Sequence, residues 1–281
     1  MKFYLATTKR LPTINLLQKH SVIRILIYSI LAFECGCTTL AVNIPMPSVS
    51  SPEVRGKRAR LSMESGLIDS QQVDVTDSAN SRPPDFSSRH IDHAVILPVG
   101  LAVGIMDRAQ VQANVSALLG SAWLLAQYQL IGEPSSTATE GNFALAFQVM
   151  GGGVWTTASG DQQVTFGPGG FPWRGTADAS FIGPGISLGY RLDEALLIYG
   201  GFAYNWYRGH SSIVQNASKD GSSAGGTYNY DSDGTASDVT VALQWGRKFS
   251  FTPEASYAAS QFKGFPVTVD LRLLGKIGLQ F

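Results

Sequence analysis

The sequence of 281 residues contains only two cysteines, Cys35 and Cys37, and both lie near the N-terminus. Everything after residue 37 therefore lacks disulfides, cysteine metal ligands and cysteine nucleophiles. Charge is also scarce, because Asp, Glu, Lys and Arg make up 15% of the chain and sum to a net charge of zero. This balance argues against binding to the phosphate backbone of nucleic acids.

The N-terminal region contains an apolar run that is too short for a membrane-spanning helix. Residues 25–33 form a run of nine residues after a basic stretch, whereas a spanning helix requires ~20. Basic residues followed by a short apolar run predict an export signal over residues 1–37. The sequence LAFECGC at 31–37 is similar to a bacterial lipobox, which makes Cys37 and Cys35 candidate lipidation sites.

Residues 38–56 have a different composition from the rest of the chain. They are rich in serine and contain Pro45, Pro47, Pro52 and Gly56. Such a composition predicts a flexible tether without a domain of its own. The remaining residues, 57–281, are expected to form one large domain.

From residue 57 onward, apolar and polar residues alternate with a period of two, which predicts β-strands. The clearest case is the C-terminal stretch 267–281, whose odd positions are Val267, Val269, Leu271, Leu273, Gly275, Ile277, Leu279 and Phe281. A strand of this length spans ~50 Å at ~3.3 Å per residue. That is long for a soluble sandwich and suits a tilted strand that crosses a membrane.

The opposite face of the predicted strands carries mostly Ser, Thr, Asn, Gln, Ala and Gly. A soluble sandwich would present many Lys and Glu residues there, whereas small neutral residues suit the narrow lumen of a barrel. The sequence predicts ten strands, or eight if the first belongs to the tether and one other assignment is wrong. They are 57–66, 94–105, 109–117, 123–132, 141–152, 178–191, 194–208, 237–248, 252–261 and 266–281.

The predicted connections alternate between short and long. Short turns are expected at 106–108, 192–194 and 248–251, and long polar loops at 67–93, 153–177 and 209–236. In outer-membrane barrels, short turns face the periplasm and long loops face the outside. The fold class is therefore predicted to be all-β, an antiparallel up-and-down transmembrane β-barrel with its C-terminus in the periplasm.

The export signal, the alternating strands, the aromatic residues near strand ends and the terminal Phe281 together resemble a small Gram-negative outer-membrane β-barrel protein. The resemblance covers residues 57–281 and implies a location in the outer membrane and contact with its lipid. In that class, the barrel-assembly machinery reads the last strand, and Phe281, Leu279 and Ile277 match the pattern that it reads. Lys276 stands where this pattern commonly has a glycine.

Charged residues on the polar face of the last two strands are expected to form a network in the lumen. Asp270, Arg272 and Lys276 share the polar face of the last strand, and Glu254 lies on that of the strand before. An unpaired charge away from water costs several kcal/mol, so these groups are expected to pair with one another. They would stabilise the barrel or line a narrow pore.

The favoured function is that of a non-enzymatic outer-membrane barrel with a structural, surface-interaction or porin-like narrow-channel role. It needs no cofactor or metal, and soluble partners are left open. One alternative is an outer-membrane lipid-modifying hydrolase that uses His210 with Ser211 or Ser212. Adjacent side chains on a strand point to opposite faces, which disfavours the first of these pairs. A second alternative is a secreted, soluble β-sandwich adhesin.

The resemblance generates a prediction about assembly. Removal of Phe281, or the substitution Phe281→Ser, should lower the amount of protein in the outer membrane and leave periplasmic degradation products. The reason is that this residue is part of the signal that the assembly machinery reads. Immunoblots of fractionated cells measure both effects, and an unchanged yield would count against the resemblance.

Overall fold

The computed structural model describes residues 39–44, 46–57, 59–65, 69–74, 89–90, 98–116, 120–163, 170–215, 225–263 and 267–281. The regular elements of these residues are all β-strands. Over the same ranges, no helix is long and apolar enough to span a membrane. The export signal expected over residues 1–37, with Cys35 and Cys37, lies outside the described residues.

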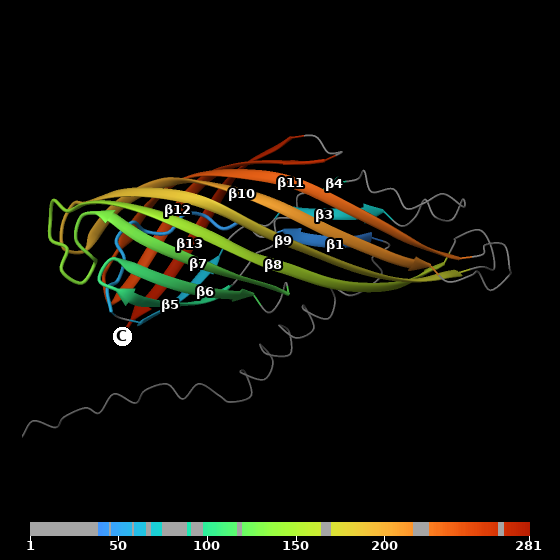
Figure 1. Ribbon diagram of the computed structural model, residues 1–281, viewed down its shortest axis with the longest axis horizontal. Coiled ribbons are helices and arrows are strands. Elements are labelled where there is room, and N and C mark those ends of the chain that lie inside the picture. The colour runs from blue at the N-terminus through green and yellow to red at the C-terminus, as the bar shows by residue number, and fades with distance from the viewer. Residues whose placement is uncertain are drawn as a thin grey trace, which may run out of the picture. The chain divides into compact units, whose positions relative to one another are not determined.

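Ten strands form a closed antiparallel barrel (Figure 1). They are β2 (Ala59–Ser65), β5 (Val99–Met106), β6 (Ala109–Ser116), β7 (Ser121–Ile131), β8 (Phe143–Gln163), β9 (Gly170–Arg191), β10 (Leu196–Gln215), β11 (Gly226–Trp245), β12 (Phe249–Phe262) and β13 (Thr268–Gln280). Each strand pairs with the next along the chain, and β13 pairs with β2 to close the ladder. The predicted ten-stranded barrel is confirmed, and the eight-stranded and sandwich alternatives are wrong.

Three further strands form a small separate sheet. They are β1 (Thr39–Ile44), β3 (Asp69–Asp74) and β4 (Arg89–His90), arranged in the order β1-β3-β4. Strand β1 also lies against β8 and β9. The range 67–93 was expected to be a loop, and β3 and β4 lie within it. Their sequences contain few apolar residues, so they lack the alternation that marks the strands of the barrel wall.

The two ends of the barrel differ in the length of their connections. At one end, which we name the turn end, residues 107–108, 192–195 and 246–248 form short connections, and residues 132–142 form a longer one. Phe281 lies at this end, and its backbone N–H donates a hydrogen bond to the carbonyl oxygen of Ala59 (3.2 Å). Both termini of the barrel wall therefore lie at the turn end. The opposite end is named the loop end.

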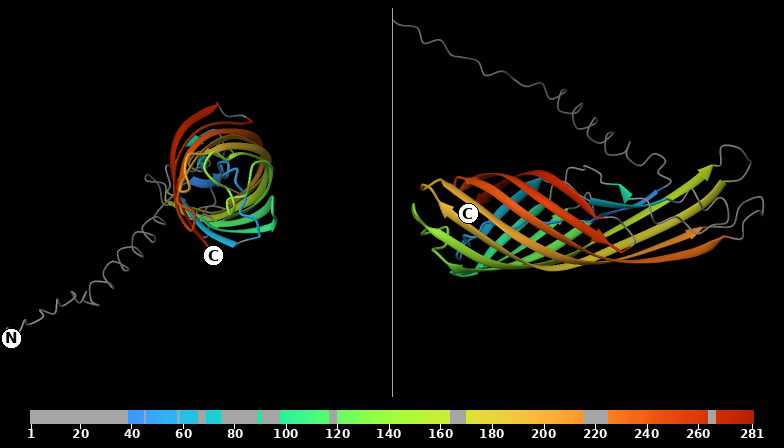
Figure 2. Two further views of the ribbon diagram at one scale, coloured as in Figure 1. Left: turned by 90° about the vertical axis from the view of Figure 1, so that its left-hand side faces the viewer. Right: turned by 90° about the horizontal axis from the view of Figure 1, so that it is seen from above.

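Four strands run on beyond their neighbours at the loop end. Strand β8 is paired with β7 only as far as Val154, and β11 is paired with β12 only from Gly234 onward. Residues 155–163, 170–179, 208–215 and 226–233 thus form a four-stranded sheet, named the extension, which continues the wall at the loop end (Figures 1 and 2).

The extension corrects the predicted loops 153–177 and 209–236, most of which are strand. The misassignment has a physical cause. In the extension, outward positions such as Asp178, Arg208 and His210 are polar and exposed. The apolar alternation therefore stops, although the backbone ladder between the strands continues.

The two faces of the wall have the chemistry that the sequence predicts. On β13, Leu271 is 70% exposed and Leu273 is 75% exposed, and apolar side chains point outward from the other wall strands in the same way. Inward positions are buried and carry mostly small or uncharged polar residues. An apolar exterior around a polar interior is the arrangement of a membrane barrel.

The two faces can be tested with one substitution on each. Leu271→Arg should destabilise the barrel by about 2–4 kcal/mol, the range for arginine near the middle of the bilayer. The control Thr268→Lys, on the inward face of the same strand, should be much milder. Equilibrium unfolding in lipid vesicles measures both, and equal losses would contradict the assignment of the faces.

Candidate functional site

The lumen of the barrel is occupied by residues 46–57, which we name the luminal segment. Seen from one end, this part of the chain lies inside the ring of strands (Figure 2). It has no regular secondary structure, in keeping with its proline content, but Val49 and Val54 have no exposed surface. A flexible tether was expected over 38–56, but residues 39–44 form strand β1 and residues 46–56 are packed in the lumen.

Glutamine side chains of the wall satisfy the backbone of the luminal segment. Three of them accept hydrogen bonds from backbone N–H groups, each at 3.1 Å: Gln148 from Ser50, Gln129 from Val54 and Gln110 from Arg55. A fourth, Gln127, donates from Nε2 to the carbonyl oxygen of Ser51 (2.6 Å). A buried backbone without a strand partner would otherwise leave these polar groups unpaired, at a cost of about 1–3 kcal/mol each.

A buried ion pair fixes the luminal segment near the turn end. The carboxylate of Glu53 accepts hydrogen bonds from Nε of Arg191 (3.0 Å) and from Nη2 of the same guanidinium. Nδ2 of Asn142 donates a further bond to it (2.9 Å). Both charged side chains are 1% exposed. The forked contact is the strongest geometry available to an arginine and a carboxylate, and water does not screen it here.

The charges predicted for the last two strands lie in the lumen close to the segment. Nζ of Lys276 is 2.9 Å from Oε2 of Glu254, and both side chains are nearly buried. Nζ of Lys276 also donates to Oγ of Ser48 (2.7 Å). The expected network therefore contains this ion pair, and it includes a residue of the presumed tether as well.

Arg272 differs from the expectation that it pairs with Asp270 or Glu254. Its Nη1 is 3.7 Å from Oδ2 of Asp238 on β11 and donates to the carbonyl oxygen of Met46 (3.1 Å). The small residue Ser256 lies next to Arg272 on β12. The long arginine side chain can therefore cross β12 and reach the next strand. Asp270, closer to the loop end of the barrel, is only partly buried.

The lumen also contains Glu53, Arg191 and Asp238, which were not among the charges predicted to pair there. Alternation assigns Asp238 to the polar face of its strand, opposite Val239, but it does not show that this carboxylate lies near Arg272. Arg191 stands at a strand end beside a turn, where alternation is a weak guide. Nothing in the composition of 38–56 marks Glu53 as buried.

The proposed hydrolase residues lie on different sides of the wall. Nδ1 of His210 is 2.6 Å from Oδ1 of Asp231, and both side chains are exposed on the outside of the extension. Ser211 points inward and is buried, as the alternation predicts, whereas Ser212 is on the same side as His210. Within the described residues, the hydrogen bond of His210 goes to a carboxylate and not to a serine.

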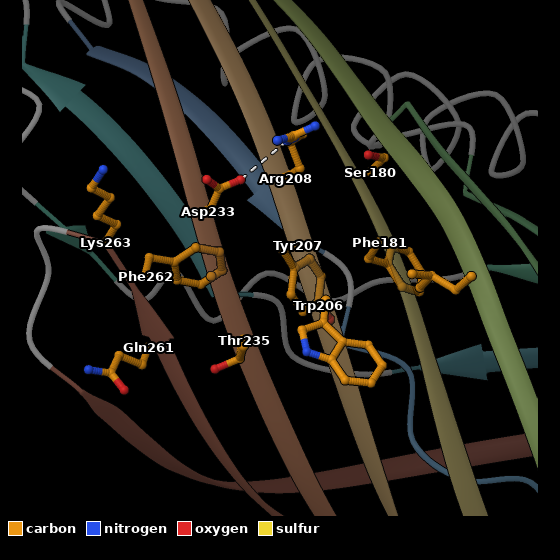
Figure 3. Close-up of a pocket in the computed structure, with 12 residues that line it drawn as sticks. Ser180, Phe181, Trp206, Tyr207, Arg208, Asp233, Thr235, Gln261, Phe262 and Lys263 are labelled. Atoms are coloured by element: carbon orange, nitrogen blue, oxygen red, sulfur yellow. Dashed lines mark hydrogen bonds and ion pairs between the residues drawn. The ribbon is translucent and has the colours of Figure 1, made fainter.

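A separate pocket of about 860 Å³ lies where β12 ends beside β11 (Figure 3). Its lining includes Trp206, Arg208 and Asp233, and Nε of this arginine is 3.4 Å from Oδ1 of this aspartate. His210 does not line it. In the described part of the chain, no group of three or more His, Cys, Asp or Glu residues is placed to hold a metal ion.

No protein-family model matches the chain, and no curated protein matches it in sequence. Among solved structures, the outer membrane protease OmpT from Escherichia coli is similar at 10% identity and a TM-score of 0.42, over 80% of this chain and 93% of that one. The outer membrane channel DcaP of Acinetobacter baumannii follows at 8% and 0.21, over 80% and 96%. The CymD monoaromatic hydrocarbon channel follows at 8% and 0.20, over 84% and 93%. These likenesses are too weak to carry an activity over to this chain.

The buried ion pair generates a stability prediction. Arg191→Met leaves the Glu53 carboxylate buried without its cation, so it should destabilise the barrel by about 3–5 kcal/mol. Adding Glu53→Gln should recover part of the loss, because the uncompensated charge is then removed. Urea unfolding in detergent micelles measures all three proteins.

The matched control is Arg208→Met, which breaks the exposed pair with Asp233. Water already screens that pair, so the loss should stay below about 1 kcal/mol. If Arg208→Met were as damaging as Arg191→Met, or if the double variant were no more stable than the single one, the buried pair would not have the role assigned to it.

Proposed function

We propose that the protein is a closed, non-enzymatic outer-membrane barrel that holds the extension in place at the cell surface. The observation that carries this proposal is the luminal segment, which fills the barrel. Of the three roles left open by the sequence, the structural and surface-interaction roles gain support and the narrow channel loses it.

The exterior of the wall supports contact with outer-membrane lipid. Exposed apolar side chains of the wall include Leu101, Leu124, Phe147, Ile186, Phe202, Val241, Tyr257 and Leu271. Soluble monomers rarely expose continuous apolar patches of more than a few hundred Å². A band of this kind around a closed barrel is stable when lipid covers it, and closed antiparallel barrels that are apolar outside and polar inside belong to outer membranes.

The interior supports a closed lumen. An eight-stranded barrel is just wide enough for its own side chains to fill, so ten strands leave additional room along the axis. The luminal segment takes up that room. A pocket lined by Ser50, Glu53 and Arg55 of the segment and by wall residues such as Lys276 has a volume of about 30 Å³. That volume suffices for about one or two water molecules.

The extension supports a role in water outside the membrane. Its outward side chains include the pairs His210–Asp231 and Arg208–Asp233, all of them exposed. Such charges are costly in lipid and stable in water. The extension therefore fits the space above the membrane, where it could meet other molecules at the cell surface.

The hydrolase alternative keeps one supporting observation, the hydrogen bond between His210 and Asp231. A nucleophilic serine needs such a base within hydrogen-bond reach. Ser211 lies on the opposite face of the strand from His210, and no hydrogen bond joins Ser212 to His210 in the described residues. The closed barrel without catalysis is therefore the better supported function.

Conductance tests the proposal directly. The full chain, reconstituted in planar lipid bilayers, should show no discrete current steps, because the luminal segment blocks the axis. Deletion of residues 38–55 should open the lumen and produce steps. Deletion of residues 217–223 at the loop end is the control and should leave the barrel closed.

Heat-modifiable migration on gels shows whether each variant is folded. Discrete steps from the folded full chain would contradict closure and restore the narrow channel. A full chain that neither inserts into lipid nor shows heat-modifiable migration would contradict the membrane barrel itself.

A further inference from the structure

We propose that the barrel carries the N-terminal side of its own chain through the lumen, so that strand β1 (Thr39–Ile44) lies on the cell-surface side of the membrane. This inference rests on the proposed outer-membrane location, with the turn end in the periplasm. It adds a direction of threading and a function for the lumen, which is to pass the N-terminal side of the chain outward.

The contacts with β13 establish the direction of the luminal segment. Met46 contacts Arg272, Ser48 contacts Lys276, and Arg55 donates from Nη1 to Oε1 of Gln280 (2.8 Å). Both sequences advance in the same order, and β13 runs to the turn end, where Phe281 lies. The segment therefore enters from the direction of the loop end and leaves at the turn end.

The exit of the segment is fixed at the turn end by further contacts. The carbonyl oxygen of Val54 accepts a hydrogen bond from the backbone N–H of Ser135, which lies in the connection between β7 and β8 (2.8 Å). The backbone of Gly56 packs directly against Gly104 near the end of β5, where any side chain would collide with it. The chain then enters β2 at Ala59, beside Phe281.

The even number of strands determines at which end of the barrel the wall begins and ends. With ten strands, both termini of the wall, Ala59 and Phe281, lie at the turn end. A chain that simply preceded β2 would leave its N-terminal residues in the periplasm. Only a second passage, through the lumen, takes them to the other side.

Strand β1, which precedes the luminal segment, lies toward the loop end. Strand β1 ends at Ile44 and pairs with β3, which follows β2 on its way from the turn end. Strand β1 also lies against β8 and β9, two of the strands that form the extension. In Figure 1, β1 and β3 lie in the half of the barrel nearer the far ends of the long strands.

The wall is shaped to hold the segment in this path. A Cβ atom on Gly201 would lie 2.7 Å from Cγ2 of Val49, and one on Gly189 would lie 2.9 Å from Cγ of Pro52. Both positions are crowded from two sides, because a Cβ atom on Gly201 would also lie 2.4 Å from the carbonyl oxygen of Ile186 and one on Gly189 would lie 2.9 Å from that of Ile198. A side chain at either position would collide with the luminal segment and with the wall. Together with the glutamine contacts and the ion pair of Glu53, this close fit indicates one defined path.

Cysteine labelling tests the direction in the full-length protein. Cys35 and Cys37 are replaced by serine, which leaves no other cysteine in the chain. Single cysteines are then introduced by Thr39→Cys at the start of β1, Asp193→Cys at the turn end and Asn216→Cys at the loop end. A membrane-impermeant maleimide is added to intact cells and, in parallel, to permeabilised cells.

The expected result is that Thr39→Cys and Asn216→Cys react in intact cells, with similar ratios of intact to permeabilised labelling. Asp193→Cys should react only after permeabilisation. Val49→Cys serves as a matched control inside the lumen, and it should react only after the barrel is unfolded.

The outcomes separate the two proposals. If Asn216→Cys reacts in intact cells and Thr39→Cys reacts only after permeabilisation, the threading is wrong while the outer-membrane barrel stands. If Asn216→Cys is also protected in intact cells, the proposed location and orientation fail, and the inference fails with them. A short epitope tag inserted after Thr38, detected by antibody on intact cells, must give the same answer.

Discussion

The structure depends on the need to fill the lumen of a closed ten-stranded barrel without leaving buried polar groups unpaired. Ten strands enclose more space than their own inward side chains occupy. Residues 46–57 of the same chain occupy this remaining space in the lumen. Their backbone has no strand partner. The glutamines of β6, β7 and β8 and the forked contact between Arg191 and Glu53 pair with it, because an unpaired group in that interior would be costly.

The same constraint helps to explain why the wall strands contain glycine. Glycines weaken a strand because they add no packing. At Gly201 and Gly189, however, both the luminal segment and the neighbouring wall strand approach so closely that a side chain would collide with them.

The outward side chains of the long strands change in character along the length of the barrel. Near the turn end, outward residues such as Ile198 are apolar, whereas further along the same strand His210 is polar and pairs with Asp231. The backbone ladder of β10 is continuous across this change. The outward face of a single strand is thus apolar over one part and polar over another.

The candidate site was partly accessible from the sequence. The inward positions of Glu254 and Lys276 follow from alternation, and the structure places these two charges together. The carboxylate nearest Arg272 belongs to Asp238, two strands away. Alternation within one strand does not show which side chains meet across neighbouring strands. Glu53 and Arg191 are separated by 138 residues, and one of them lies in a stretch with no periodicity at all.

The all-β class, the closed barrel and the two faces of its wall could be predicted from the sequence, whereas the full lengths of β8 to β11 could not. The predicted features follow from local properties, since a strand shows its two environments at every second residue. It takes the three-dimensional fold to show that residues 46–57 lie in the lumen, in which direction they run and which charges meet there. The reason is that an irregular segment has no repeating pattern, so its position follows from contacts with residues distant in the chain.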